Sequence, residues 1–326
     1  MKKKRKLLLV SFFSVFFTVT VNAQYQTTVV IKEGVQDARL RTAIEKNSAL
    51  LLTELNNAQG EARQLSFQGI DIDQKAAKDL SVMWEVCPFR CDELKIEESG
   101  LGTLAGGYQI RNIPVIMEPR EGERTDEDTY QEIVLNFDRM GKIVDLCFSL
   151  SANQYKDIMR SDLEVNDLNH RSKVIDFVEQ FRTAYNQKNM NFLEDVFSDD
   201  ALIITGKVIQ REKKDESITW GPQVEYIVQK KKDYLNRLAS VFRNNAWVNV
   251  NFKDIKVNRH RTKKNIYGVK LVQSWKSSSY SDEGYLFLLW DFKDEDKPKI
   301  HVRAWQPLNE TPKEEVFDLG DFTVGQ

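Results

Sequence analysis

Residues 284–292 read GYLFLLWDF and are apolar on both alternating sets of positions. The two sets are Leu286, Leu288 and Trp290, and Tyr285, Phe287 and Leu289. A strand with one face in water alternates apolar and polar residues, so this strand is expected to be covered on both faces. We expect helices over one face, and over the other either an N-terminal domain or a second copy of the chain.

The first 23 residues form a separate pattern that predicts export. Basic residues from Lys2 to Lys6 precede an apolar run from Leu7 to Val21, and Ala23 ends a small-residue cleavage site. This is the layout of a secretory signal peptide, with an apolar run too short to cross a bilayer comfortably. Cleavage after Ala23 is expected to place the chain in the periplasm or cell envelope of a Gram-negative bacterium, without a stable membrane span.

Length and charge narrow the class of protein further. The chain has 326 residues, which suits about two domains. It carries 47 basic and 49 acidic residues, and loss of the five basic residues of the leader gives a formal charge of −7. An acidic exported protein lacks the basic face that sequence-independent nucleic-acid binding requires, so no nucleic-acid partner is predicted.

Three cysteines are present, and two of them, Cys87 and Cys91, lie in the motif CPFRC. An oxidising compartment favours a disulfide, and a redox or copper site is the alternative. The spacing is one residue longer than that of a C-x-x-C redox motif. We interpret the pair as a structural disulfide or as buried free thiols. The chain shows no metal-ligand cluster, glycine-rich phosphate loop or G-x-S-x-G motif, so no metal, cofactor or catalytic residue is predicted.

The N-terminal half predicts helices followed by an antiparallel sheet. Apolar residues recur at helical spacing over 35–58, and a second helix over 73–86 begins at the capping residue Asp73. A strand over 106–119 and a hairpin over 129–150 follow, with the turn at 138–141. The polar stretch 151–170 separates this domain, 24–160, from the rest of the chain, with a linker at 161–170.

The C-terminal half predicts helix, helix, strand, helix and then an antiparallel meander. Val174, Phe177, Val178, Phe181 and Tyr185 share one face of the first helix. A short helix ends at Phe197, a strand covers 201–205, and Ile227 together with 231–242 forms the third helix. Strand-like runs follow at 246–257, 266–277, 284–292 and 299–305, and 311–326 is a C-terminal tail.

The segment FVEQFRTAYNQKNMNFLEDVFSDDALIITG, with this order of elements, resembles the opening of the nuclear transport factor 2-like superfamily, which includes ketosteroid isomerase. The resemblance covers about 170–306, and we assign the domain to 171–310. It implies an α+β fold in which a cone-shaped sheet lines a cavity, and a homodimer formed through the outer sheet face. The N-terminal half resembles no family that we recognise.

The same resemblance argues against isomerase chemistry. The oxyanion-holding tyrosine of the isomerase falls on Phe181, and its proton-abstracting aspartate falls on Thr205. Phenylalanine cannot donate a hydrogen bond, and threonine is no base near neutral pH. We interpret Asp199 and Asp200 as residues of the turn between the second helix and the first strand, where aspartate bonds local backbone.

Alternation along HVRAW places His301, Arg303 and Trp305 on one face of the last strand. The predicted ligand-binding residues are His301, Arg303, Trp290, Thr205 and Tyr185. The function expected is that of a non-catalytic exported protein that binds a small apolar ligand or an envelope protein. A lyase or isomerase acting on a small hydrophobic substrate is the alternative, and two or more titratable groups on the cavity floor would favour it.

Overall fold

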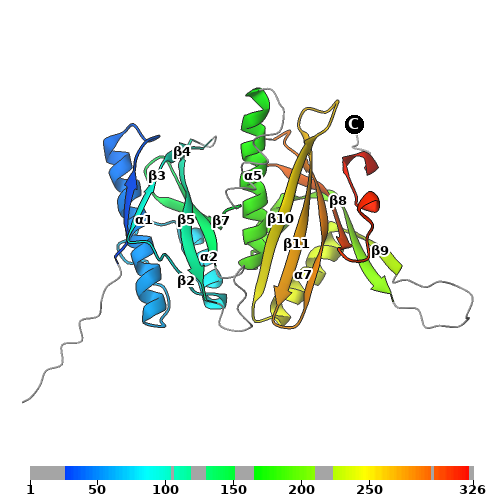
Figure 1. Cartoon of the computed structure of the whole chain (residues 1–326), viewed down its shortest axis with the longest axis horizontal. Helices are drawn as coiled ribbons and strands as arrows, with labels where there is room; N and C mark the ends of the chain where they lie inside the picture. Colours follow the sequence, from blue (N-terminus) through cyan, green and yellow to red (C-terminus); the bar gives the residue numbers. More distant parts are fainter. Residues whose placement is uncertain are drawn as a thin grey trace, which may run out of the picture.

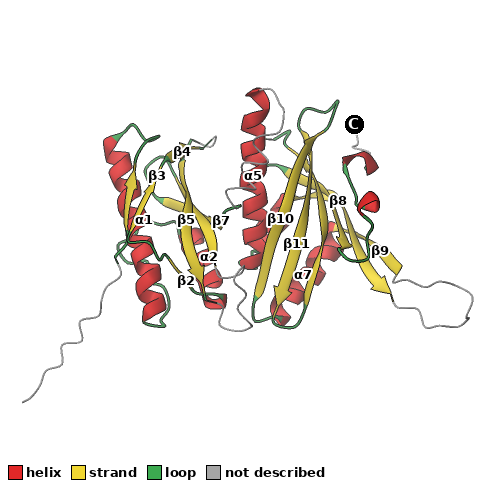
Figure 2. Ribbon diagram, viewed as in Figure 1, coloured by secondary structure: helices red, strands yellow, loops and turns green. Residues whose placement is uncertain are grey.

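The computed structural model describes residues 26–103, 106–118, 130–150, 165–209, 223–294 and 297–322. Two units of sheet and helix lie on opposite sides of the long helix α5 (Val165–Asn186), which begins inside the range predicted as the linker (Figure 1). Figure 2 shows helices and strands mixed in both units, which confirms the α+β class. The predicted leader lies outside the described residues. No helix in the described ranges is long and apolar enough to cross a membrane.

In the part of the chain that the structure describes, the N-terminal unit has two helices and two sheets. Its helices are α1 (Ala38–Gly60) and α2 (Gln74–Val86). Its strands are β1 (Thr28–Ile31), β2 (Phe89–Arg90), β3 (Lys95–Glu98), β4 (Gly100–Gly102), β5 (Tyr108–Met117), β6 (Tyr130–Phe137) and β7 (Ile143–Phe148). Strands β2, β5, β6 and β7 form an antiparallel sheet in that order, β4 pairs with β5, and β1 pairs with β3 in parallel.

Local signals set the ends of these elements. The Asp37 carboxylate caps α1, and the Asp73 carboxylate accepts from the Lys75 amide at 2.8 Å and caps α2, as predicted. In the predicted hairpin turn, Asp138 Oδ1 accepts from the amides of Met140 and Lys142. The apolar faces of both helices pack on one face of the sheet and form the N-terminal core.

The other face of this sheet packs against α5. Thr183 Oγ1 of α5 accepts from the Phe148 amide at 3.1 Å, and Glu179 Oε1 accepts from the Leu150 amide at 2.6 Å. Arg111 of β5 donates to the same Glu179 oxygen at 2.5 Å. Helix α5 therefore belongs to the packing of both units.

The C-terminal unit is a curved sheet with helices on its inner face. Its remaining helices are α6 (Met190–Val196) and α7 (Lys231–Asn244). Its strands are β8 (Phe197–Ile209), β9 (Gln223–Lys230), β10 (Val248–Arg259), β11 (Ile266–Ser277), β12 (Ser281–Asp291) and β13 (Lys299–Pro307). The sheet order is β10-β11-β12-β13-β8-β9; β13 and β8 are parallel and the other neighbours are antiparallel.

Aromatic side chains fill the inner core. The ring of Phe181 on α5 meets those of Tyr185, Phe197 and Trp290 edge to face, with centroids 5.0, 5.9 and 6.3 Å apart. The predicted apolar face of α5 is therefore the face that packs on the inner side of the sheet.

Two sequence-based expectations about local structure are wrong. Ile227 lies in strand β9 and not in the third helix. It was assigned to the helix because its spacing from Lys231 and Tyr234 fits a helix equally well. Asp199 and Asp200 lie in β8 itself, since the strand begins directly after α6 at Phe197 without an intervening turn.

The outer face of the sheet is covered by residues 311–322, which we call the C-terminal strap. The strap contains the short 3-10 helices η1 (Lys313–Glu315) and η2 (Leu319–Asp321). Phe322 stacks on Phe287 with ring centroids 5.2 Å apart, and the Lys270 amine pairs with Asp318 at 2.8 Å. The prediction that both faces of 284–292 are covered is confirmed. The cover on the outer side is the chain's own tail and not the N-terminal domain as expected, and a homodimer stays a prediction.

None of the three cysteines forms a disulfide with another described residue in this structure. Cys87 Sγ is directed to the Pro88 carbonyl oxygen at 3.9 Å, whereas Cys91 Sγ is directed to that of Glu93 at 3.7 Å. The structure therefore shows no disulfide within CPFRC, with Cys91 buried and Cys87 half-buried.

Candidate functional site

The predicted ligand-binding residues separate into a core group, an inner-face group and one residue outside both. Trp290 and Tyr185 are fully buried in the aromatic core. Thr205 and Arg303 project from the inner face, since their neighbours Ile203 and Trp305 on the same side belong to the inner core. His301 lies apart from these four residues.

A bulge in β13 explains the position of His301. Arg303 pairs with Leu288 and Ile300 pairs with Trp290, so His301 is an extra residue opposite β12. The bulge reverses the alternation of side chains along the strand. His301 therefore does not lie on the inner face with Arg303, contrary to the prediction. Its imidazole lies 3.6 Å from the carboxylates of both Asp200 and Asp291, and its side chain is 35% exposed.

Arg303 forms the centre of a polar cluster on the inner face. Its guanidinium lies over the Tyr234 ring, 5.1 Å from the centroid, and within hydrogen-bonding reach of the Tyr185 hydroxyl. The hydroxyls of Tyr185 and Tyr234 are 2.6 Å apart. Burial, and then the neighbouring Tyr234, raise the pKa of Tyr185 well above its usual value, so its hydroxyl stays a hydrogen-bond donor at neutral pH.

Further polar groups reach the same face from β9, β12 and β13. Asp282 shares a face with Leu286 and Leu288 by alternation along β12, and Gln229 pairs with the inner residue Ile203. The Trp305 ring lies directly against Gly284, where an added Cβ would meet the ring at 2.4 Å. Burial raises the pKa of Asp282, although the Tyr280 hydroxyl and Arg303 lower it in part.

Four of these side chains carry a buried polar atom without a hydrogen-bond partner among the described residues. The atoms are Arg303 Nε, Trp305 Nε1, Asp282 Oδ1 and Gln229 Oε1. Tyr234, Asp282 and Gln229 were not predicted as site residues from the sequence. Alternation on β12 places Asp282 on the same face as Leu286, and this pattern could have predicted Asp282 as a residue of the inner face. Tyr234 was assigned to the apolar stripe of α7, and Gln229 lies on a strand that was not predicted.

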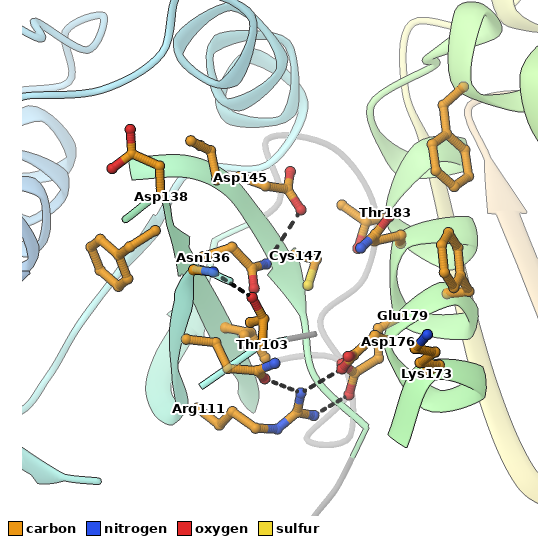
Figure 3. Close-up of a pocket in the computed structure, with 18 of the residues that line it drawn as sticks. Thr103, Arg111, Asn136, Asp138, Asp145, Cys147, Lys173, Asp176, Glu179 and Thr183 are labelled. Carbon is orange, nitrogen blue, oxygen red and sulfur yellow. Dashed lines mark hydrogen bonds and ion pairs between the residues drawn. The ribbon is translucent and has the colours of Figure 1, made fainter. Parts of the chain in front are cut away.

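A cavity of about 820 Å³ lies between the sheet of the N-terminal unit and helix α5 (Figure 3). The sheet contributes Arg111 from β5, Asn136 from β6, and Asp145 and Cys147 from β7. Helix α5 contributes a polar stripe at helical spacing, Ser172, Asp176, Glu179 and Thr183. Only the apolar stripe of this helix was recognised in the sequence, so the cavity was not predicted.

Three titratable groups that line this cavity have pKa values above their ordinary ones. Burial raises the pKa of Asp145 to about 6, although Lys75 opposes the shift. Burial and the neighbouring Glu179 raise the pKa of Asp176 to about 7, against the opposing effect of Arg111. Burial raises the pKa of the Cys147 thiol well above its usual value, so Cys147 is not a nucleophile at neutral pH.

Comparison with known proteins found similar solved structures only. No protein-family model matches the chain, and no curated protein matches it. A nuclear transport factor 2-like protein from Cytophaga hutchinsonii is 14% identical, with a TM-score of 0.32, over 45% of this chain and 100% of that one. The beta subunit of a putative aromatic-ring-hydroxylating dioxygenase from Novosphingobium aromaticivorans is 14% identical, with a TM-score of 0.33, over 47% of this chain and 99% of that one.

The protein Bd1075 of Bdellovibrio bacteriovorus is also 14% identical, with a TM-score of 0.34, over 46% of this chain and 45% of that one, so the match spans less than half of that protein. The strand order and helix positions described above are those of a nuclear transport factor 2-like fold in the C-terminal unit. This fold is compatible with ligand binding and with isomerase-like chemistry, and it assigns neither.

Proposed function

We propose that the protein is an exported binding protein that holds a small, largely apolar ligand against the inner face of its C-terminal sheet. The observation that carries the proposal is the pair of buried donors, Arg303 Nε and Trp305 Nε1, that lack a partner among the described residues. A buried donor without an acceptor costs about 1–3 kcal/mol. A ligand oxygen placed between these donors would recover that cost.

The surroundings of the two donors define the ligand further. The side chains next to Arg303 are the rings of Tyr234 and Tyr185, and Trp305 belongs to the apolar inner core. A ligand that fits has an apolar or aromatic body and a carbonyl or carboxylate oxygen for the donors. A hydroxyl group on the ligand would in addition serve Asp282 Oδ1 or Gln229 Oε1.

Native mass spectrometry of protein purified from its own cell envelope tests this proposal. Wild-type protein should carry a bound small molecule, and Trp305→Phe and Arg303→Met should each lower its occupancy. Trp84→Phe is the matched control, because it removes an indole N–H that donates to the Arg63 carbonyl oxygen in the N-terminal unit. Equal occupancy in all four proteins would contradict the proposal. A bound polypeptide in place of a small molecule would favour the envelope protein partner.

The same preparation tests export. N-terminal sequencing should find a mature chain that begins at Gln24, after cleavage at Ala23. An intact Met1 on membrane-bound protein would contradict the proposed export.

A lyase or isomerase is the second candidate, because titratable groups converge on the inner face. Asp282, with its raised pKa, is the group suited to take a proton, and the Tyr185 hydroxyl is suited to donate a hydrogen bond to a developing oxyanion. Asp282→Asn should then trap substrate where the wild type holds product. The recovered compounds should differ in mass for a lyase, or in chromatographic retention for an isomerase. Identical compounds from both proteins favour simple binding.

A further inference from the structure

The cavity between the N-terminal sheet and α5 is a second site, separate from the inner face of the C-terminal sheet. Its volume of about 820 Å³ lies within the range of small-molecule sites, roughly 300–1,000 Å³. Figure 3 shows Asp145, Asn136 and Arg111 on the sheet side, opposite Asp176, Glu179 and Thr183 on the helix side. We propose that this cavity binds a small organic amine as its ammonium cation.

The Arg111 guanidinium in the cavity is already engaged by protein groups. Arg111 Nη2 donates to Glu179 Oε1 at 2.5 Å, while Nη1 donates to Gln109 Oε1 at 2.8 Å and to Asp176 Oδ1 at 3.4 Å. One guanidinium therefore serves two carboxylates. An anionic ligand would have to compete with both of them for Arg111.

Two carboxylates of the cavity, those of Asp145 and Glu179, in contrast keep oxygen atoms that no described cation contacts. The Asp145 side chain accepts from the Asn136 amide nitrogen at 3.5 Å, and no described cation lies within 4 Å of it. Glu179 is 1% exposed, and its Oε2 has no hydrogen-bond partner among the described residues. These are acceptors in a low-dielectric site, where an ammonium group bonds strongly.

Within the described ranges, no ion pair joins Asp145 to the other cations that line the cavity, although Lys75 lies near enough to lower its pKa in part. The charged residues that line the whole cavity are Lys75, Arg111, Arg139 and Lys173, and Asp138, Asp145, Asp176 and Glu179. Lys75 pairs with Asp79 at 2.9 Å, outside the cavity lining. The polar groups of Gln180 and Thr103 also line the cavity and would bind hydroxyl groups of the ligand. No cluster of three metal-ligating side chains occurs in the described ranges, which favours an organic cation over a metal ion.

Isothermal titration calorimetry on the full mature chain tests the proposal with two pairs of probes. Putrescine and glucosamine carry ammonium groups, and butanediol and glucose are their neutral counterparts. We expect saturable binding of at least one amine and none of its neutral counterpart. Asp145→Asn should weaken amine binding by about tenfold or more, the effect of removing a charge-assisted hydrogen bond.

Two control variants make the result decisive. Asp92→Asn removes an exposed carboxylate of the same unit that does not line the cavity, and it should leave amine binding unchanged. Asp176→Asn is the second cavity variant, to be used if Asp145→Asn does not fold. Arg303→Met should bind amines like the wild type, which separates this site from the inner-face site. Failure of both amines to bind, equal binding of amines and neutral compounds, or wild-type affinity in the folded cavity variant would each overturn the proposal.

Discussion

Arg111 of β5 and Glu179 of α5 form a buried ion pair that joins the two units, with Nη2 and Oε1 2.5 Å apart and side chains 8% and 1% exposed. The same Glu179 oxygen accepts from the Leu150 amide, where the chain leaves the N-terminal sheet. The two units therefore share one hydrogen-bonded centre, and the stability of each depends on the position of α5.

Replacing Arg111 should strongly destabilise the protein. Arg111→Met leaves Glu179 buried without its counter-ion, and breaking a buried pair in this way costs about 3–5 kcal/mol. Urea denaturation measures the loss. Lys32→Met, which breaks the exposed pair with Glu97, is the control and should change the free energy of unfolding by less than about 1 kcal/mol. Equal effects of the two substitutions would show that the buried pair does not hold the units together.

Asp145→Asn should stabilise the protein at high pH and not at low pH. The folded-state pKa of about 6 lies above the ordinary value of 3.8, so ionisation costs more in the folded state. This cost is absent below 3.8, grows as the pH rises towards 6, and is constant above it. Because Asp145 is only partly buried, we expect a gain of about 1–2 kcal/mol above pH 6.

Thermal or urea unfolding of Asp145→Asn and wild type across this pH range checks the sign. Asp92→Asn, at an exposed position, supplies the control for loss of one negative charge. A variant that is less stable than wild type above pH 6 would mean that the Asp145 carboxylate is stabilised in the folded protein, contrary to the direction of its pKa shift.

Removal of the C-terminal strap should cause self-association. Deleting 311–326 uncovers an apolar patch on the outer sheet face formed by Ile204, Phe287, Leu289 and Val302. Exposed apolar patches on a sheet favour association with another copy. Size-exclusion chromatography with light scattering should find a larger species for the deletion variant, and Glu314→Gln should match the wild type. A deletion variant that stays at the wild-type size would contradict this prediction.

Asp199 and Asp200 should be dispensable. Asp199 accepts from the Lys231 amine at 2.9 Å on the surface, and the Asp200 side chain is 81% exposed beside His301. Neither carboxylate reaches the inner face around Arg303. Asp199→Asn and Asp200→Asn should therefore keep the unfolding midpoint and the ligand occupancy of the wild type in a combined melting and mass-spectrometry assay. Loss of ligand in a fully stable variant would place the pair in the binding site.

Much of the fold could be predicted from local patterns. Asp73 begins α2, Asp138 turns the β6–β7 hairpin, and 284–292 is buried on both faces, because caps, turns and alternation act over a few residues. The curved sheet of the C-terminal unit was expected from the family resemblance of 170–306, not from local patterns.

The candidate site depended on features that local patterns do not carry. One extra residue at the β13 bulge turns His301 away from Arg303, and no motif in HVRAW predicts this bulge. Asp282 and Arg303 face the same side of the sheet only because the neighbouring strands β12 and β13 pair in this register. Arg111 and Glu179 are 68 residues apart, and their contact exists only because the two units share α5. The polar stripe of that helix was the one visible signal of the second cavity.

A crystal structure of the protein purified from its native envelope tests the central claim most directly. We predict a small molecule on the inner face of the C-terminal sheet, with an oxygen about 2.7–3.2 Å from Arg303 Nε or Trp305 Nε1. Its apolar part should lie against Tyr234. Protein or water atoms bonded to both donors, with no ligand against them, would contradict the claim.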